Sequence, residues 1–121
     1  MQTIMLIEDD AVMRSLLRTL LELEGFTVAE SGSGNNMDQY MDDIRAAQPN
    51  LIVMDVHLGT VNGFDLLARM RASEDLSQIR VVISSGMDLS VRCREAEVDG
   101  FIMKPYMPDD FLRYISTIIG N

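Results

Sequence analysis

Four apolar runs of this sequence each end in side chains that can do chemistry. The endings are three consecutive acids, one further carboxylate, a pair of hydroxyls and the only lysine of the chain: Glu8-Asp9-Asp10, Asp55, Ser84-Ser85 and Lys104. Carboxylate oxygens bind hard divalent cations, and a hydroxyl or an ammonium group can hold a phosphoryl oxygen. Together these groups suggest a site for a metal ion and a phosphoryl group.

Asp55 is the candidate nucleophile of that site. It closes the apolar run 51–54 and therefore stands at the C-terminal tip of a predicted buried strand, where ligands bind in open α/β sheets. An aspartate carboxylate can accept a phosphoryl group as an acyl phosphate, and Mg²⁺ would neutralise charge in the transition state. The alternative is a loop aspartate that caps the following helix.

The acidic run at 8–10 has two interpretations. Taken alone, it indicates a helix N-cap, with Asp9 or Asp10 accepting backbone N–H groups. Beside Asp55, it would crowd several carboxylates together, and a like-charge pair at about 4 Å costs about 4 kcal/mol at an effective dielectric of about 20. Protonation or a divalent cation must compensate, and oxygen ligands favour Mg²⁺.

Ser85 and Lys104 are the candidates for contacts with phosphoryl oxygens. Gly86 after Ser85 leaves room and a backbone N–H, although Ser84 competes for the role and an ordinary strand-end turn is the alternative. Lys104 precedes Pro105, and a cis bond there would aim the ammonium into the site; the alternative is a surface lysine.

His57, the only histidine, lies two residues after Asp55. It could be a general base. We favour the interpretation in which its backbone carbonyl faces the metal and its side chain lies at the rim.

Composition narrows the class of protein. A length of 121 residues with 47% apolar content suits one ordered domain with a core, and the net charge of −9 argues against direct nucleic acid binding. The single cysteine, Cys93, excludes an internal disulfide and suits a reducing compartment. No signal peptide or membrane span is visible, so we expect a soluble cytoplasmic protein.

Strands and helices are expected to alternate along the chain. Strands are predicted at 4–7, 26–29, 51–54, 80–84 and 101–103. Helices are predicted at 11–24, from 37 to before Pro49, around 64–70, weakly near 88–97 and after Pro108. Five such units predict a parallel sheet covered by helices on both faces, with all strand C-termini at one edge.

Two local details complete this prediction. In the first helix, one apolar face is expected to comprise Val12, Leu16, Leu20 and Leu23. The Ser/Gly/Asn stretch 31–36 is predicted to be a flexible loop.

The order and placement of these motifs resemble the receiver domain of two-component response regulators. The resemblance covers the chain from Thr3 to Ile119 and implies one receiver domain over residues 1–121. The implied fold is α/β and flavodoxin-like: a (βα)5 three-layer sandwich with a parallel five-stranded sheet of order 2-1-3-4-5.

The resemblance also implies a metal and phosphoryl site. Glu8 and Asp9 match the acidic pair that holds Mg²⁺, and Asp55 matches the phosphoaccepting aspartate. His57 stands where the family uses a backbone carbonyl as a metal ligand.

A switch is implied as well. Ser85 matches the switch hydroxyl, Lys104 with Pro105 matches the family's Lys-Pro pair, and Phe101 matches the switch aromatic. By resemblance, a histidine kinase or histidine phosphotransfer protein is the donor. The domain would catalyse its own phosphorylation and dephosphorylation rather than act as an enzyme, and would then change a docking surface for an output domain or effector protein.

Two of the departures from the family pattern bear on the loops and helices around the site. Gly59 stands where a proline is common, so that loop is expected to be more mobile. The stretch between Ser85 and Lys104 is shorter than usual by roughly one helical turn, so the fourth helix is expected to be short and the usual output face altered.

Three other readings stay open. A degenerate receiver would act only as an interaction module. A hydrolase with an aspartyl-phosphate intermediate would need a second aspartate where His57 stands, and a flavodoxin would need a phosphate-binding loop in place of Glu8 and its neighbours. Whether the domain stands alone or belongs to a longer regulator is also open.

Overall fold

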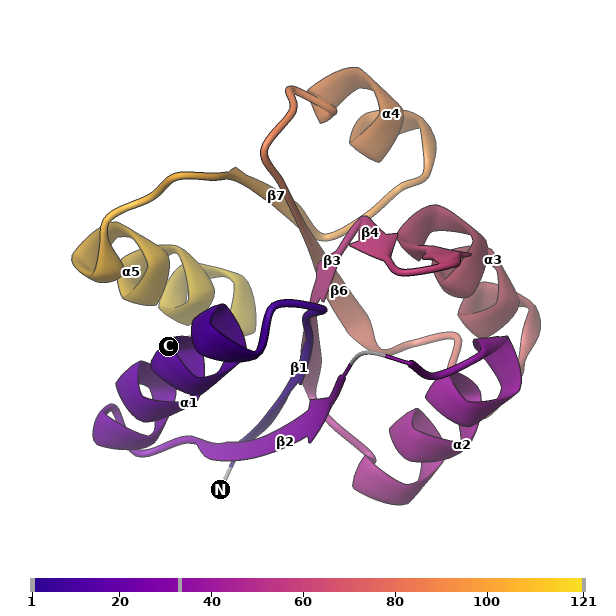
Figure 1. The fold of residues 1–121 in the computed structure, drawn as a ribbon, viewed down its shortest axis with the longest axis horizontal. Coiled ribbons are helices and arrows are strands. Elements are labelled where there is room, and N and C mark those ends of the chain that lie inside the picture. Colours follow the sequence, from indigo (N-terminus) through magenta and orange to yellow (C-terminus); the bar gives the residue numbers. More distant parts are fainter. Residues whose placement is uncertain (1, 33, 121) are drawn as a thin grey trace.

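A parallel five-stranded sheet runs through the middle of the protein, with helices on both faces (Figure 1). The structure, a computed structural model, describes residues 2–32 and 34–120, so Ser33 of the predicted 31–36 loop lies outside the described residues. The strands of this sheet are β1 (Thr3–Ile7), β2 (Thr27–Ser31), β3 (Leu51–Asp55), β6 (Arg80–Ser85) and β7 (Gly100–Met103).

The order of these strands across the sheet is β2-β1-β3-β6-β7. In sequence order this is the predicted 2-1-3-4-5 arrangement, and all neighbouring strands are parallel. The flavodoxin-like fold is therefore confirmed, and the C-terminal ends of all five strands lie at one edge.

The helices are α1 (Ala11–Leu23), α2 (Met37–Ala47), α3 (Gly63–Ala72), α4 (Ser90–Glu95) and α5 (Pro108–Ile119). Helices α1 and α5 cover one face of the sheet, and α2 and α3 cover the other, whereas α4 lies beyond β7 (Figure 1). Helix α4 has only six residues, which agrees with the short fourth helix expected from the sequence.

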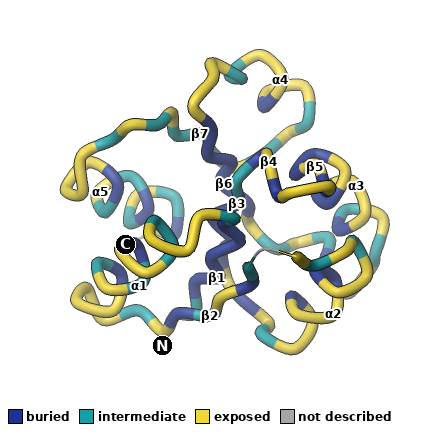
Figure 2. The backbone as a smooth tube through the Cα atoms, viewed as in Figure 1, coloured by how far each residue is buried: buried dark blue, intermediate teal, exposed yellow. Residues whose placement is uncertain are grey.

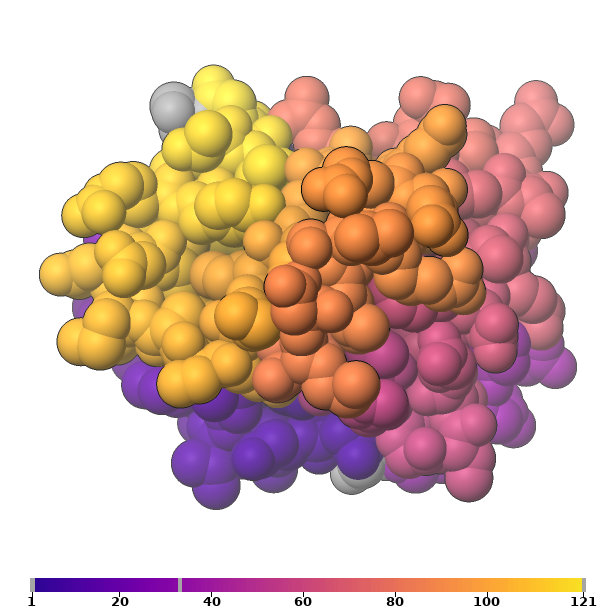
Figure 3. Space-filling model, turned by 90° about the horizontal axis from the view of Figure 1, so that it is seen from above, coloured from indigo at the N-terminus to yellow at the C-terminus, as the bar shows by residue number. Residues whose placement is uncertain are grey.

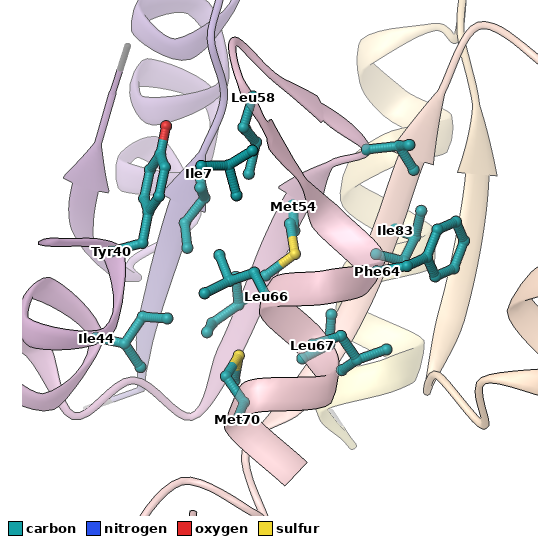
Figure 4. Packing of buried hydrophobic residues seen from close by; sticks show 14 of the residues in the cluster. Ile7, Tyr40, Ile44, Met54, Leu58, Phe64, Leu66, Leu67, Met70 and Ile83 are labelled. Atoms are coloured by element: carbon teal, nitrogen blue, oxygen red, sulfur yellow. The ribbon is translucent and has the colours of Figure 1, made fainter. Parts of the chain in front are cut away.

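Alternate residues of the strands build two cores, because successive side chains of a strand point to opposite faces. Ile4 and Leu6 join the core under α1 and α5, whereas Met5 and Ile7 join the core under α2 and α3. Figure 4 shows the second of these cores, and Figure 2 shows the buried strands between helices whose outer faces are exposed.

The predicted inner face of α1 is wrong. Leu17 and Leu21 are buried, whereas Val12 and Leu23 are 80% and 79% exposed. The helix is so rich in leucine that its apolar arc is wider than the strip that a sheet can cover. Packing against the sheet buries the stripe that contains Leu17 and Leu21. The periodicity of the sequence alone does not distinguish this stripe from the predicted one.

A small hairpin after β3 is absent from the sequence prediction. β4 (His57–Leu58) and β5 (Val61–Asn62) pair antiparallel, and Gly59 in the turn has φ 67°. Leu58 and Val61 are buried, so the loop that was expected to be more mobile is tied down by two apolar side chains. Ser31, predicted in a loop, ends β2 instead, because its pairing with Ile7 extends that strand.

Candidate functional site

Glu8, Asp55 and Lys104 meet at the C-terminal edge of the sheet. The Lys104 ammonium donates to Glu8 Oε1 at 2.6 Å and to Asp55 Oδ2 at 3.4 Å. We call these three residues the acid–lysine centre. They lie far apart in the sequence, and the parallel topology brings them together as predicted.

The strands position each member of the centre. Ile7 pairs with Met54 in the β1–β3 register, so the next residues, Glu8 and Asp55, leave the sheet side by side. Lys104 directly follows β7, its backbone N–H donates to the Ser85 carbonyl at 2.8 Å, and its peptide bond to Pro105 is cis.

Burial makes the electrostatics of the centre strong. The exposed fractions of the side chains are 6% for Glu8, 15% for Asp55 and 22% for Lys104. Burial, followed by the hydrogen bond and charge of Asp55, raises the pKa of Glu8 in spite of Lys104. Burial disfavours the Lys104 ammonium, but Glu8 and then Asp55 outweigh this and raise its pKa. Two carboxylates thus share one cation, which leaves the site attractive to a second.

The two acids that follow Glu8, Asp9 and Asp10, have different surroundings. The Asp10 carboxylate caps α1, because its Oδ1 accepts the N–H groups of Val12 and Met13 at 2.9 and 3.1 Å. The capping interpretation of the acidic run therefore applies to Asp10, whereas Asp9 is half-buried between the cap and Glu8.

The donors available for a metal are oxygens. Among residues 2–32 and 34–120, no three His, Cys, Asp or Glu side chains converge as a metal-ion cage. The adjoining carboxylates of Glu8 and Asp55 form an open, oxygen-only half-site, which is the kind that suits Mg²⁺ because this ion keeps several water ligands.

His57 meets Asp55 through its backbone. Its N–H donates to Asp55 Oδ1 at 3.3 Å, and the residue itself is exposed. This arrangement agrees with an imidazole at the rim and gives no support to a general base.

Ser85 and Phe101 lie on the side of the centre near α4. Ser85 is 1% exposed, and its Oγ accepts the Met87 N–H at 3.0 Å. Phe101 is half-buried and packs against the core under α2 and α3. The competing hydroxyl, Ser84, pairs with Asp55 in the β3–β6 register but has no hydrogen-bond partner.

Three residues near the site escaped sequence reasoning. Arg14 on α1 donates to the Glu8 carbonyl at 2.7 Å, and the half-buried Tyr106, whose hydroxyl oxygen is buried, follows Lys104 by two residues. A Cβ on Gly63 would lie 2.7 Å from the Asp55 carbonyl oxygen, so only glycine allows α3 to approach this strand so closely. The Asn62-Gly63 pair is a turn signal, but nothing in the sequence connects it to Asp55.

A shallow hollow adjoins Phe101. It lies between α4, β7 and α5, has a volume of about 270 Å³, and is lined in part by Cys93, Phe101 and Tyr114. Figure 3, seen from this side, shows the α4 segment between α5 and α3. None of the helices in the described part of the chain has the length and apolarity needed to span a bilayer.

Comparison with known proteins gives one consistent family. The family model for the response regulator receiver domain matches residues 4–116. The two-component response regulator ORR7 of Oryza sativa subsp. japonica is 30% identical over 121 residues, a match that covers 96% of this chain and 56% of ORR7. The polar-differentiation response regulator DivK of Brucella ovis is 26% identical over 123 residues, covering 99% of this chain and 98% of DivK.

Solved structures agree on the fold. The chemotaxis response regulator CheY4 of Vibrio cholerae superposes with a TM-score of 0.86 at 15% identity, over 98% of both chains. The chain spans about half the length of the first relatives that it matches, ORR7 and the DNA-binding response regulators named MtrA.

Proposed function

Because the chain belongs to the response regulator receiver domain family of two-component signalling, we propose that Asp55 is its phosphoacceptor. The donor is a phosphohistidine of a sensor histidine kinase or of a histidine phosphotransfer protein. The observation that carries this proposal is the Lys104 ammonium bonded to both Glu8 and Asp55 in a mostly buried site.

In the proposed transfer, an Asp55 carboxylate oxygen attacks the phosphorus atom in line with the bond to the donor imidazole. The new O–P bond forms as the P–N bond breaks, and the electron pair leaves with the imidazole nitrogen. The Lys104 ammonium holds a phosphoryl oxygen, where its charge stabilises the transition state. In the reverse half of the cycle, water attacks the phosphorus and releases phosphate from Asp55.

Receiver domains typically use Mg²⁺. Glu8 and Asp9 are proposed to hold this ion together with Asp55 and the backbone carbonyl of His57. When bound, Mg²⁺ neutralises negative charge on the transferring phosphoryl oxygens. The raised pKa of Glu8, caused first by burial and then by Asp55, supports the proposal, because a bound cation would favour the ionised carboxylate.

The proposed switch uses Ser85 and Phe101. The Ser85 hydroxyl leaves the Met87 N–H and turns to a phosphoryl oxygen on Asp55, and the Phe101 ring moves inward. Phosphorylation thus biases two conformations of one segment. The hollow beside α4 changes shape with Phe101, which offers a readout to an output domain or an effector protein.

Receiver domains are signalling domains, and we propose that residues 1–121 form one such unit in the cytoplasm that acts on no further substrate. A hydrolase has less support, because His57 meets Asp55 through its backbone rather than as a base. A pure docking module has one observation in its favour: α4 is short and has no side-chain N-cap.

Intact-mass measurement after incubation with Mg²⁺ and acetyl phosphate tests the proposal. We expect one phosphoryl adduct on the wild type and none on Asp55→Asn or after chelation of Mg²⁺. An adduct that persists in Asp55→Asn would overturn the assignment. If the wild type forms no adduct, beryllofluoride binding separates two explanations. A receiver that needs a protein donor would still bind beryllofluoride. A docking module would bind it no better than the Asp55→Asn variant does.

A further inference from the structure

Two buried hydroxyl groups near the acid–lysine centre have no hydrogen-bond partner among the described residues. Ser84 Oγ and Tyr106 Oη are the buried side-chain polar atoms without a hydrogen-bond partner in the part of the chain that the structure describes. Buried hydroxyls nearly always find a partner, because an unpaired one has lost its water without compensation. Two such groups in one place therefore call for a functional reason.

Both groups lie on the same side of the sheet. Val82 belongs to the core under α1 and α5, and strand alternation directs Ser84 to that side as well. Tyr106 packs against the same core, where its ring stacks on Phe111 with 5.3 Å between ring centroids.

The electrostatics indicate that the two hydroxyls are neighbours. Burial raises the pKa of the Tyr106 phenol, whereas the Lys104 ammonium and then the Ser84 hydroxyl, which approaches the phenol without completing a hydrogen bond, act to lower it. Each hydroxyl can both donate and accept, so each can satisfy the other.

Their position connects them to the only lysine. Tyr106 follows Lys104 by two residues, and Ser84 is the register partner of Asp55. The Lys104 N–H already donates to the carbonyl of Ser85, the residue next to Ser84. A bond between the two hydroxyls would thus fasten the lysine-bearing loop to β6 at a second point, at the residue that pairs with Asp55.

We propose that Tyr106 and Ser84 are positioning residues for Lys104, whose hydroxyls bond to each other when Asp55 carries a phosphoryl group. Movement of Ser85 toward the phosphoryl group shifts the backbone of Ser84, its neighbour in β6, and closes the bond. The closed bond holds the loop so that the ammonium stays on the phosphoryl oxygen. This inference rests on the roles of Asp55 and Lys104 proposed above.

The test compares Tyr106→Phe, Ser84→Ala and the double variant with the wild type. Tyr40→Phe is the matched control, because it loses a phenol hydroxyl that donates to the Gly32 carbonyl at 3.0 Å in the core under α2 and α3, on the opposite face of the sheet. The rate of phosphorylation by acetyl phosphate at saturating Mg²⁺ is measured by intact mass. We expect each single variant to be slower by about two- to tenfold, and the double variant to be no slower than either single one.

The lysine itself gives a second readout. In protein labelled with ¹³C only in lysine, Lys104 gives the only lysine signals, and its two ε-protons have distinct shifts when the side chain is held. With beryllofluoride and Mg²⁺ bound, we expect distinct shifts in the wild type and Tyr40→Phe, and merged shifts in Tyr106→Phe and Ser84→Ala.

Other outcomes separate the two proposals. The positioning role would be overturned if the losses of rate in the two single variants added up in the double variant. It would also be overturned if the Lys104 ε-proton shifts stayed distinct in both single variants. Ser84 and Tyr106 would then contribute to packing alone. A wild type that neither forms an adduct nor binds beryllofluoride would instead refute the proposed function and, with it, this inference. The thermal unfolding midpoint of each variant checks that it folds.

Discussion

The acid–lysine centre and the segment from Ser85 to Phe101 lie at the same edge of the sheet but are built differently. The centre draws its side chains from the ends of β1, β3 and β7, and its members are joined by ion pairs. The segment passes through a six-residue helix without a side-chain cap and exposes Met87 and Val91.

This difference assigns different tasks to the two regions. In the proposed mechanism, the groups that keep a fixed geometry lie at the ends of buried strands, where opening requires much of the fold to unfold. The groups proposed to move adjoin a segment with an exposed short helix, where local rearrangement is less costly. The chemistry and the response can therefore be changed separately by mutation.

The largest expected effect is at Lys104. Lys104→Met keeps the length of the side chain but removes the charge, and we expect phosphorylation by acetyl phosphate to slow by about 10²–10³-fold. Arg113→Met, on the exposed side of α5, is the control and should keep the wild-type rate. A rate within threefold of wild type would show that the centre does not depend on its lysine.

The glycines of the two regions give the next effect. Gly63→Ala places a methyl group 2.7 Å from the Asp55 carbonyl oxygen, so we expect a loss of about 1–3 kcal/mol in the free energy of unfolding. Gly86→Ala meets nothing within 4 Å and should change it by less than about 0.5 kcal/mol. Urea denaturation of both variants measures the two changes in the free energy of unfolding. Equal losses in the two variants would contradict the prediction.

A smaller effect is expected at Ser85. Ser85→Ala removes the acceptor of the Met87 N–H and should lower the free energy of unfolding by about 0.5–1.5 kcal/mol. The adduct should still form, but amide exchange in residues 86–101 should no longer respond to beryllofluoride. A response equal to that of wild type would remove Ser85 from the switch.

The smallest effect concerns Glu8 without metal. Its raised pKa means that ionisation of Glu8 weakens the fold, so this group stabilises at low pH and loses that contribution as the pH rises through its folded pKa. Glu8→Gln should therefore unfold at a higher temperature than wild type at about pH 8, and the difference should shrink toward pH 4.5, the ordinary value for Glu. Thermal scans in chelator across this range measure it, and a lower midpoint for Glu8→Gln at about pH 8 would contradict it.

Much of the fold was predictable because its signals are local. Continuous apolar runs marked four of the five strands of the main sheet, and Pro49 marked the end of the second helix. The hairpin at 57–62 was missed because two-residue strands carry no periodic signal, and it depends on buried contacts of Leu58 and Val61. The inner face of α1 was wrong because its sequence offers two apolar stripes.

The sequence predicted which residues form the candidate site but not the contacts between them. Glu8, Asp55 and Lys104 were identified because they follow predicted strands, and the structure brings them together. The roles of Asp9, His57, Ser85 and Phe101 remain predictions. Tyr106 was missed because a tyrosine after Lys-Pro carries no signal in the sequence, and only the fold brings its hydroxyl near Ser84.

The sequence by itself determined the alternation of strands and helices and hence which residues stand at strand tips, because apolar periodicity follows from local backbone geometry. It also determined that these tips share an edge, because parallel strands joined by right-handed crossovers leave no other arrangement. Only the tertiary structure decided which carboxylates share Lys104, that Asp10 rather than Asp9 caps α1, and that the hydroxyls of Ser84 and Tyr106 are buried without hydrogen-bond partners in the described part of the chain. Those outcomes depend on how elements distant in sequence pack to within an ångström, which no local pattern records.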